Sequence, residues 1–342
     1  MDKISELIHD LNSEDEKTRA FAAEDIAYDG FAEGFDALVE RLLIEPSRFV
    51  SEAIVNSLKS TPLPDKIGTI IPLLYNDDAF IRNAAVDILS VQGEEAVPYL
   101  QDVLHNPDKD VRKFVLDALF LINADYCADL IAQGLDDSDI NNVITAVEYL
   151  GRMEANNHCD TINRIFMDTD NILLRCTCLE AMAVIGNKES VEYVGKMYPT
   201  YQRISFLEEY SFLKFVSRQG SEIHLPLIIA LMKNKGQVMH KEIINAIEGI
   251  LRRSTLRELP GDLLDALSVY LQANINDINK YELLLLLSEY KNQEILSLLL
   301  AYLNPDNHLL CLGAVEGLGI YGDAQAVPYL NELTSRGVVD DD

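Results

Sequence analysis

Apolar residues recur at helical spacing in two consecutive stretches of the chain, and residues 93–121 show this arrangement most clearly. In residues 97–104 they return every three or four positions, as on one face of a helix. His-Asn-Pro-Asp at 105–108 has the chemistry of a turn and ends that helix. Asp110 stands where an N-cap belongs, before a second helix. We predict that its buried stripe consists of Val111, Val115, Leu116, Ala118 and Leu119. The segment therefore predicts an antiparallel helical hairpin.

The same pattern returns ten times, at a spacing close to 31 residues. The positions equivalent to Arg112 are Arg19, Ser51, Arg82, Arg112, Val143, Arg175, about Leu207, His240, about Lys280 and Cys311. A fixed period of this length predicts a stacked solenoid, in which each unit buries its apolar face against its neighbours. The register stays open near residues 207 and 280, where the arginine and most small residues are missing.

Two motifs of the repeat carry a resemblance to a known family. Residues 110–119 read Asp-Val-Arg-Lys-Phe-Val-Leu-Asp-Ala-Leu, and both 93–100 and 322–330 end in Ala-Val-Pro-Tyr-Leu. Together they resemble the HEAT repeat, and the short period resembles the bacterial subgroup that includes phycobilin-lyase-like repeats. The resemblance covers nearly the whole chain and implies an all-α fold, a right-handed α-α superhelix (HEAT-like solenoid) of about ten helical hairpins. It implies that the second helices line the concave surface, and it says little about activity.

Composition fits one long solenoid in a reducing compartment. We predict a single solenoid over 1–337 and a disordered tail at 338–342. In the first repeat Asp25 takes the place of Ala118, which suits an end unit. No apolar run reaches the roughly 18 residues that a membrane span needs. Five scattered cysteines without CxxC spacing favour free thiols over disulfides or a metal site. We therefore expect a soluble, cytoplasmic protein with no cofactor, no metal and no membrane partner.

Charge divides the chain into three segments. The net charge is −28, with −22 in the acidic repeats 1–194 and −11 in the C-terminal repeats 258–337 and the tail. Residues 195–257 carry ten basic and five acidic side chains, a net +5. A strongly acidic body repels phosphate backbones, so we expect no nucleic-acid partner.

An acidic ridge is predicted along the second helices, at the solvent-facing position of Asp117. The equivalent residues are Glu24, Asn56, Asp87, Asp117, Glu148, Glu180, Phe212, Asn245, about Leu285 and Glu316. Two interpretations stay open: a solvated helix face, which is typical of HEAT repeats, or a groove that steers a cationic partner. Phe212 and Leu312 would be binding anchors if they are exposed.

Residues 193–257 form the second candidate site, because the one positive segment also gathers aromatic residues. The aromatics are Tyr193, Tyr198, Tyr201, Phe206, Tyr210, Phe212 and Phe215. The candidate partner-binding cations are Lys214, Lys241, Arg252, Arg253 and Arg257, which could accept carboxylates or phosphates. The alternative is that the aromatics fill one degenerate repeat and the bases pair with acidic neighbours.

No catalytic constellation stands out. Six histidines are dispersed among the repeats, and neither a Gly-rich phosphate loop nor a nucleophile elbow occurs. We therefore predict a non-enzymatic scaffold or regulatory adaptor that binds a protein partner of unknown identity, with its oligomeric state open. The alternative is a phycobilin (tetrapyrrole) lyase or lyase subunit acting on antenna proteins, in which bases at 214–257 hold bilin propionates. A third possibility is a structural spacer.

Overall fold

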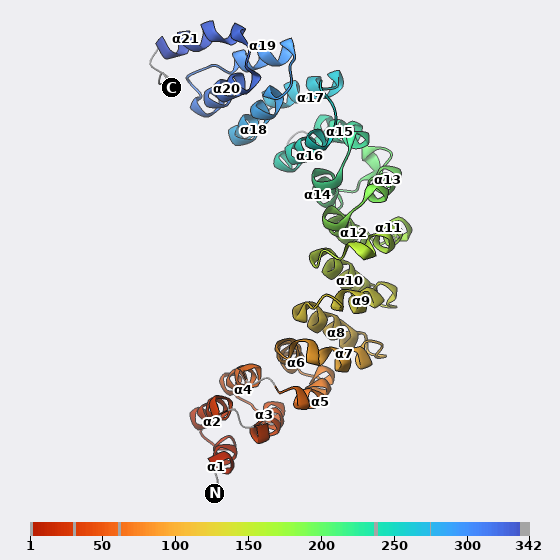
Figure 1. The fold of residues 1–342 in the computed structure, drawn as a ribbon, viewed down its shortest axis with the longest axis vertical. Coiled ribbons are helices and arrows are strands. Elements are labelled where there is room, and N and C mark those ends of the chain that lie inside the picture. Colours follow the sequence, from red (N-terminus) through yellow and green to blue (C-terminus); the bar gives the residue numbers. More distant parts are fainter. Residues whose placement is uncertain (1–2, 30–31, 61–62, 236–238, 274, 336–342) are drawn as a thin grey trace. The chain divides into compact units, whose positions relative to one another are not determined.

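The computed structural model describes residues 3–29, 32–60, 63–235, 239–273 and 275–335, all of which lie in helices, turns or loops (Figure 1). The predicted tail 338–342 lies outside the described residues. The chain forms two compact units, residues 1–155 and 156–342, which are described separately. In the part of the chain that is described, no helix is both long and apolar enough to cross a bilayer.

Unit 1 is a stack of helical hairpins, in which each second helix packs on the second helix of the next hairpin (Figure 1). The second helices are α2 (Glu16–Asp29), α4 (Arg48–Ser60), α6 (Ala79–Val91), α8 (Lys109–Ile122) and α10 (Ile140–Arg152). The first helices are α1 (Lys3–Asp10), α3 (Ala32–Ile44), α5 (Ile67–Ile70), α7 (Val97–Val103) and α9 (Cys127–Ile131). Short 3₁₀ segments extend several of the first helices: η1 (Pro64–Lys66), η2 (Ile71–Tyr75), η3 (Gly93–Ala96) and η4 (Ala132–Asp136).

Unit 2 continues the same hairpin pattern. Its second helices are α12 (Ile172–Ile185), α14 (Glu209–Gln219), α16 (His240–Arg253), α18 (Asp277–Ser288) and α20 (His308–Tyr321). The first helices are α11 (Cys159–Asp168), α13 (Lys188–Met197), α15 (Leu225–Lys235), α17 (Gly261–Gln272), α19 (Gln293–Ala301) and α21 (Val327–Ser335). The 3₁₀ segments are η5 (Asn156–His158), η6 (Tyr201–Arg203), η7 (Glu222–His224) and η8 (Ala324–Ala326).

The hairpin predicted at 93–121 is confirmed, with one correction at its cap. All five residues of the predicted stripe in α8 are buried. The N-cap is Asp108 and not Asp110, because Asp108 has an extended backbone and its carboxylate accepts the backbone N–H of Asp110 at 2.9 Å. Asp78 caps α6 and Asp139 caps α10 in the same way. In these three hairpins, the aspartate that directly precedes the second helix therefore caps it.

The register predicted for the seventh repeat is wrong by two residues. The buried side chains that flank Lys214 on α14 are Phe212, Leu213, Phe215 and Val216. They match the buried side chains that flank Asp117 on α8, which are Val115, Leu116, Ala118 and Leu119. Lys214 therefore takes the Asp117 position that the sequence assigned to Phe212. Phe212 is 0 % exposed and packs edge-on against Tyr198, with ring centroids 5.5 Å apart. It fills the core and is not an exposed anchor, whereas Leu312 is 49 % exposed.

Candidate functional site

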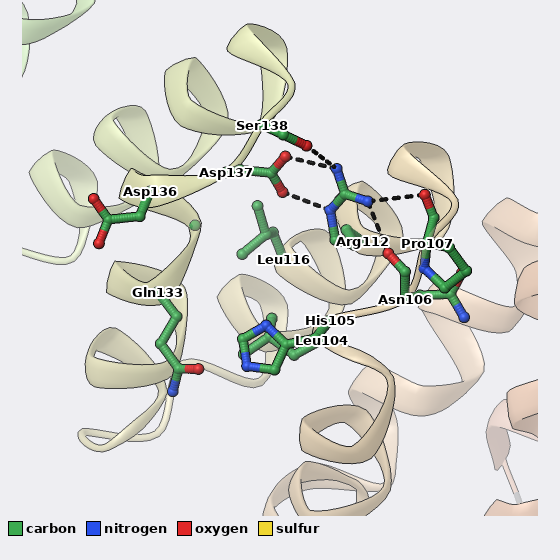
Figure 2. A pocket seen from close by; sticks show the side chains of 11 residues that line it. Leu104, His105, Asn106, Pro107, Arg112, Leu116, Gln133, Asp136, Asp137 and Ser138 are labelled. Atoms are coloured by element: carbon green, nitrogen blue, oxygen red, sulfur yellow. Dashed lines mark hydrogen bonds and ion pairs between the residues drawn. The ribbon is translucent and has the colours of Figure 1, made fainter.

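The recurring arginine of the repeat is a structural joint between hairpins (Figure 2). Nε and Nη2 of Arg112 donate to the two carboxylate oxygens of Asp137, each at 2.7 Å, and Nη1 donates to the carbonyl oxygen of Asn106. Further donor contacts go to the Pro107 carbonyl oxygen and the Ser138 hydroxyl. Hydrogen bonds from Arg112 are the main cause that lowers the pKa of Asp137 to about 2. The guanidinium is fully engaged, so the cavity of about 590 Å³ around it offers no free arginine donor to a ligand.

The same joint recurs elsewhere in the stack. Arg19 donates through Nε and Nη2 to the carboxylate of Glu45, and Arg175 donates to Glu208 at 3.0 Å. Arg82 departs from the rule: Pro107 stands where a carboxylate would be, and the guanidinium lies 5.4 Å from the ring centroid of Phe114. These arginines stabilise the repeat, since each connects the loop before its own helix to the following hairpin.

The acidic ridge is partly neutralised by the protein's own cations. Each of the four candidate carboxylates has an ion-pair partner. The pairs are Asp87 with Lys59 (3.3 Å), Asp117 with Lys113 (2.7 Å), Glu148 with Arg152 (3.2 Å) and Glu180 with Lys214 (2.7 Å). Asp117 also accepts the hydroxyl of Tyr149 at 2.7 Å. Such pairing weakens the field that a cationic partner would feel, and the cationic-partner groove stays a prediction.

The predicted basic residues at the end of α16 have different surroundings. Arg253 donates to three carbonyl oxygens at the end of α14: Val216 and Ser217 at 2.8 Å and Gly220 at 3.0 Å. Such contacts serve the carbonyl oxygens at a helix C-terminus, although the Val216 oxygen also accepts the backbone N–H of Gly220 at 2.9 Å. Arg252 is exposed and forms an ion pair with Glu248 at 2.5 Å, one turn earlier on α16. Arg257 is exposed in the loop before α17.

Lys214 and Lys241 are the two predicted cations that the structure brings together. They lie in the α14–α16 groove, a cavity of about 480 Å³ between these two helices. The groove is lined by Tyr210, Leu213, Lys214, Ser217, Arg218, Lys241, Glu242 and Asn245. Lys241 and Arg218 are exposed, and neither forms an ion pair with any residue that the structure describes. The groove therefore presents three cations and one carboxylate.

Arg218 is the groove residue that sequence reasoning missed. It lies four positions after Lys214 on α14, so both side chains share one face of the helix. That spacing could have identified it. Gly249 of α16 sets the width of the crossing, because a Cβ there would lie 1.9 Å from the carbonyl oxygen of Ser217. The missing side chain lets α16 approach α14 closely.

The aromatic cluster of 193–257 divides between core and surface. Tyr198, Phe212 and Phe215 are fully buried, and the hydroxyl of Tyr198 donates to Glu208 at 2.7 Å. For these three residues the core-filling alternative is confirmed. Phe206 and Tyr210, in contrast, are 69 % and 49 % exposed. Tyr198 also borders a cavity of about 750 Å³ between α13, η6 and α15, lined mainly by apolar side chains.

Comparison with known proteins shows the fold and no family. No family model matches the chain, and the comparison with curated proteins found no match. Among solved structures, importin beta has a TM-score of 0.60 and 13% identity over 97% of this chain and 54% of its own. The karyopherin Kap121p, bound to the extreme C-terminus of the protein phosphatase Cdc14p, also has a TM-score of 0.60, with 12% identity over 97% of this chain and 43% of its own. This chain thus spans about half of each of these two proteins.

An engineered protein matches over its full length and 94% of this chain, with a TM-score of 0.52 and 15% identity. The phycocyanin lyase complex CpcE–CpcF from Nostoc sp. PCC7120 is also found, at 15% identity and a TM-score of 0.31. With the helical hairpins described above, the two karyopherin matches confirm the predicted fold class. The chain is an all-α, HEAT-like repeat solenoid.

Proposed function

We propose that the chain is a non-enzymatic interaction scaffold or regulatory adaptor that binds a protein partner at the α14–α16 groove. The observation that carries this proposal is the grouping of Lys214, Arg218 and Lys241 around one cavity. The chain has 56 acidic and only 28 basic side chains, so carboxylates are abundant on its surface. Two cations without an ion-pair partner among the described residues therefore mark a surface suited to an external anion.

The side chains that most often act in catalysis support the non-enzymatic part of the proposal. Burial raises the pKa of the thiols of Cys127, Cys159 and Cys176, so little reactive thiolate forms at neutral pH. His224 is fully buried between the rings of Phe212 and Phe215, away from any substrate. Neither group is arranged as an activated nucleophile or an accessible base.

The test is affinity capture from the native cell lysate with the wild-type chain and a charge-reversed variant, Arg218→Glu with Lys241→Glu. Arg252→Glu is the matched control, because it reverses an exposed arginine of α16 outside the groove. Arg253 is left intact, since reversing it would remove three hydrogen bonds to α14. Circular dichroism checks that all variants fold.

We expect a partner protein that the wild type and Arg252→Glu retain and that the double variant loses. Equal retention by all three chains would contradict the groove as the binding site. Retention of a tetrapyrrole-bearing protein would favour the lyase alternative. If folded wild-type chain retains nothing, the structural spacer becomes the better interpretation.

A further inference from the structure

This inference rests on the proposed function and concerns the chemistry of the partner. Tyr210, Lys214 and Arg218 follow one another at intervals of four residues along α14, so they form one line on its surface. Lys241 reaches the same cavity from α16. Because Lys214 already pairs with Glu180, Arg218 and Lys241 are the cations available to a ligand.

An apolar patch lies at the start of this line. Phe206 and Leu207, in the loop before the N-cap of α14, are 69 % and 62 % exposed, and Tyr210 in the first turn is 49 % exposed. We call these three residues the apolar shelf. Single exposed apolar residues are ordinary on protein surfaces. Here three exposed ones stand within five positions of the chain, which suits contact with an apolar side chain of a partner.

We propose that the α14–α16 groove and the apolar shelf together bind an acidic peptide segment of the partner. Its carboxylates face Arg218 and Lys241, and an aliphatic or aromatic side chain packs on the shelf. Arginine binds a carboxylate through two parallel hydrogen bonds, while lysine acts as a point charge. Apolar contact beside these pairs excludes water and strengthens them.

Charge complementarity selects this occupant. The surface bears exposed cations, so a basic segment is repelled, and Glu242 in the groove limits how much negative charge fits. A nucleic acid carries a charge on every phosphate and would also meet the repulsion of a chain with net charge −28. A short peptide with a few carboxylates meets much less repulsion. A phosphorylated segment presents the same anionic chemistry, so the experiment includes it.

Fluorescence anisotropy with labelled synthetic peptides tests the inference. The probe carries a leucine–phenylalanine pair followed by a run of glutamates. Matched peptides replace the glutamates with glutamines, replace the leucine–phenylalanine pair with serines, or replace one glutamate with phosphoserine. The proteins are the full-length wild type, Arg218→Glu with Lys241→Glu, Phe206→Ser with Leu207→Ser, and Arg252→Glu as the control.

We expect the acidic probe to bind the wild type and Arg252→Glu equally and the charge-reversed variant about tenfold or more weakly, since each exposed pair contributes modestly and reversal also adds repulsion. The glutamine peptide should lose a similar factor, and both serine changes should weaken binding. Tighter binding of the phosphoserine peptide would support the groove as an anion-binding site and assign a phosphorylated segment as its ligand. Equal affinity of wild type and charge-reversed variant would overturn the inference, as would no binding of any probe to folded wild type at low salt.

The two proposals fail in different ways. If capture of a partner depends on the groove but excess acidic probe does not displace that partner, the acidic-segment inference fails and the proposed function stands. If the probe binds the groove but the charge reversal changes the capture of no protein, the proposed function fails. Self-association that the charge reversal abolishes would assign the groove to a second copy of the chain and overturn the inference.

Discussion

At the scale of single residues, the role of a side chain in this protein is decided by partners about thirty positions away. Arg252 and Arg253 are neighbours in sequence, but helix geometry points them in different directions. Arg253 caps α14 through three carbonyl oxygens, and Arg252 remains on the surface beside Glu248. A count of basic residues identified the positive segment 195–257, but it does not say where each side chain points. For that reason the sequence could nominate Arg253 and could not separate it from Lys241.

His224 gives the first prediction, a loss of stability in mild acid. Burial is the main cause that lowers its pKa to about 4, and Nε2 has no hydrogen-bond partner among the described residues. The unfolded chain takes up a proton near the ordinary value of 6.5, while the folded chain resists it. The stability is therefore fully present above pH 6.5 and is lost as the pH falls from 6.5 toward 4, by about 2 kcal/mol at pH 5.

The matched variant for this prediction is His224→Gln. The backbone N–H of Ser221 donates to Nδ1 of His224, and a glutamine at this position of a capping box can accept the same hydrogen bond without titrating. Urea unfolding of both proteins at pH 7.5 and pH 5 checks the prediction. The wild type should lose more stability than the variant between these values, and an equal loss would show that His224 is not a buried neutral group.

At the scale of elements, the hairpins were predictable because each helix repeats its apolar residues with the period of the α-helix. The register of the seventh repeat was not predictable, because this repeat lacks the arginine and most of the small residues of the other repeats. Glu208 stands at the N-cap of α14 without capping it, and its carboxylate instead accepts hydrogen bonds from Tyr198, Arg175 and Ser205. Because Lys214 takes the Asp117 position, buried Glu208 stands where α8 has the apolar Val111. Nothing local in the sequence reveals this network, so the predicted register slipped and put Phe212 on the surface.

The close crossing of α14 and α16 gives a prediction at this scale. Gly249→Ala places a Cβ 1.9 Å from the carbonyl oxygen of Ser217, so the two helices must separate. We expect a loss of about 1–3 kcal/mol, as for overpacking in a core. Gly319→Ala on α20 is the control, because nothing lies within 4 Å of its added Cβ.

The control substitution should be neutral or stabilising by up to about 1 kcal/mol, because alanine favours the helix more than glycine does. Thermal and urea unfolding of the two variants decide the point. Anisotropy with the acidic probe adds a second measurement: Gly249→Ala should alter its affinity, since the groove lies between these helices, and Gly319→Ala should not. Equal stability of the two variants would contradict the close crossing.

At the scale of the whole molecule, charge opposes folding and directs binding at the same time. A net charge of −28 generates repulsion that acts between distant side chains, which salt screens over a Debye length of about 8 Å at physiological ionic strength. The arginine joints are different, because they are short-range and largely buried: Arg112 and Asp137 meet at 2.7 Å with little exposure. Salt screens such pairs less than it screens the long-range repulsion.

Added salt should therefore act in opposite directions on stability and on binding at the groove. Raising NaCl from low concentration to about 0.5 M weakens the repulsion among the excess carboxylates while leaving the buried joints largely intact, so we expect the Tm to rise. The same screening weakens the attraction of Arg218 and Lys241 for an acidic probe, so its affinity should fall. Calorimetry and anisotropy across one salt series measure both. A Tm that falls with salt would mean that exposed ion pairs, such as Glu148 with Arg152, stabilise the protein more than its net charge destabilises it.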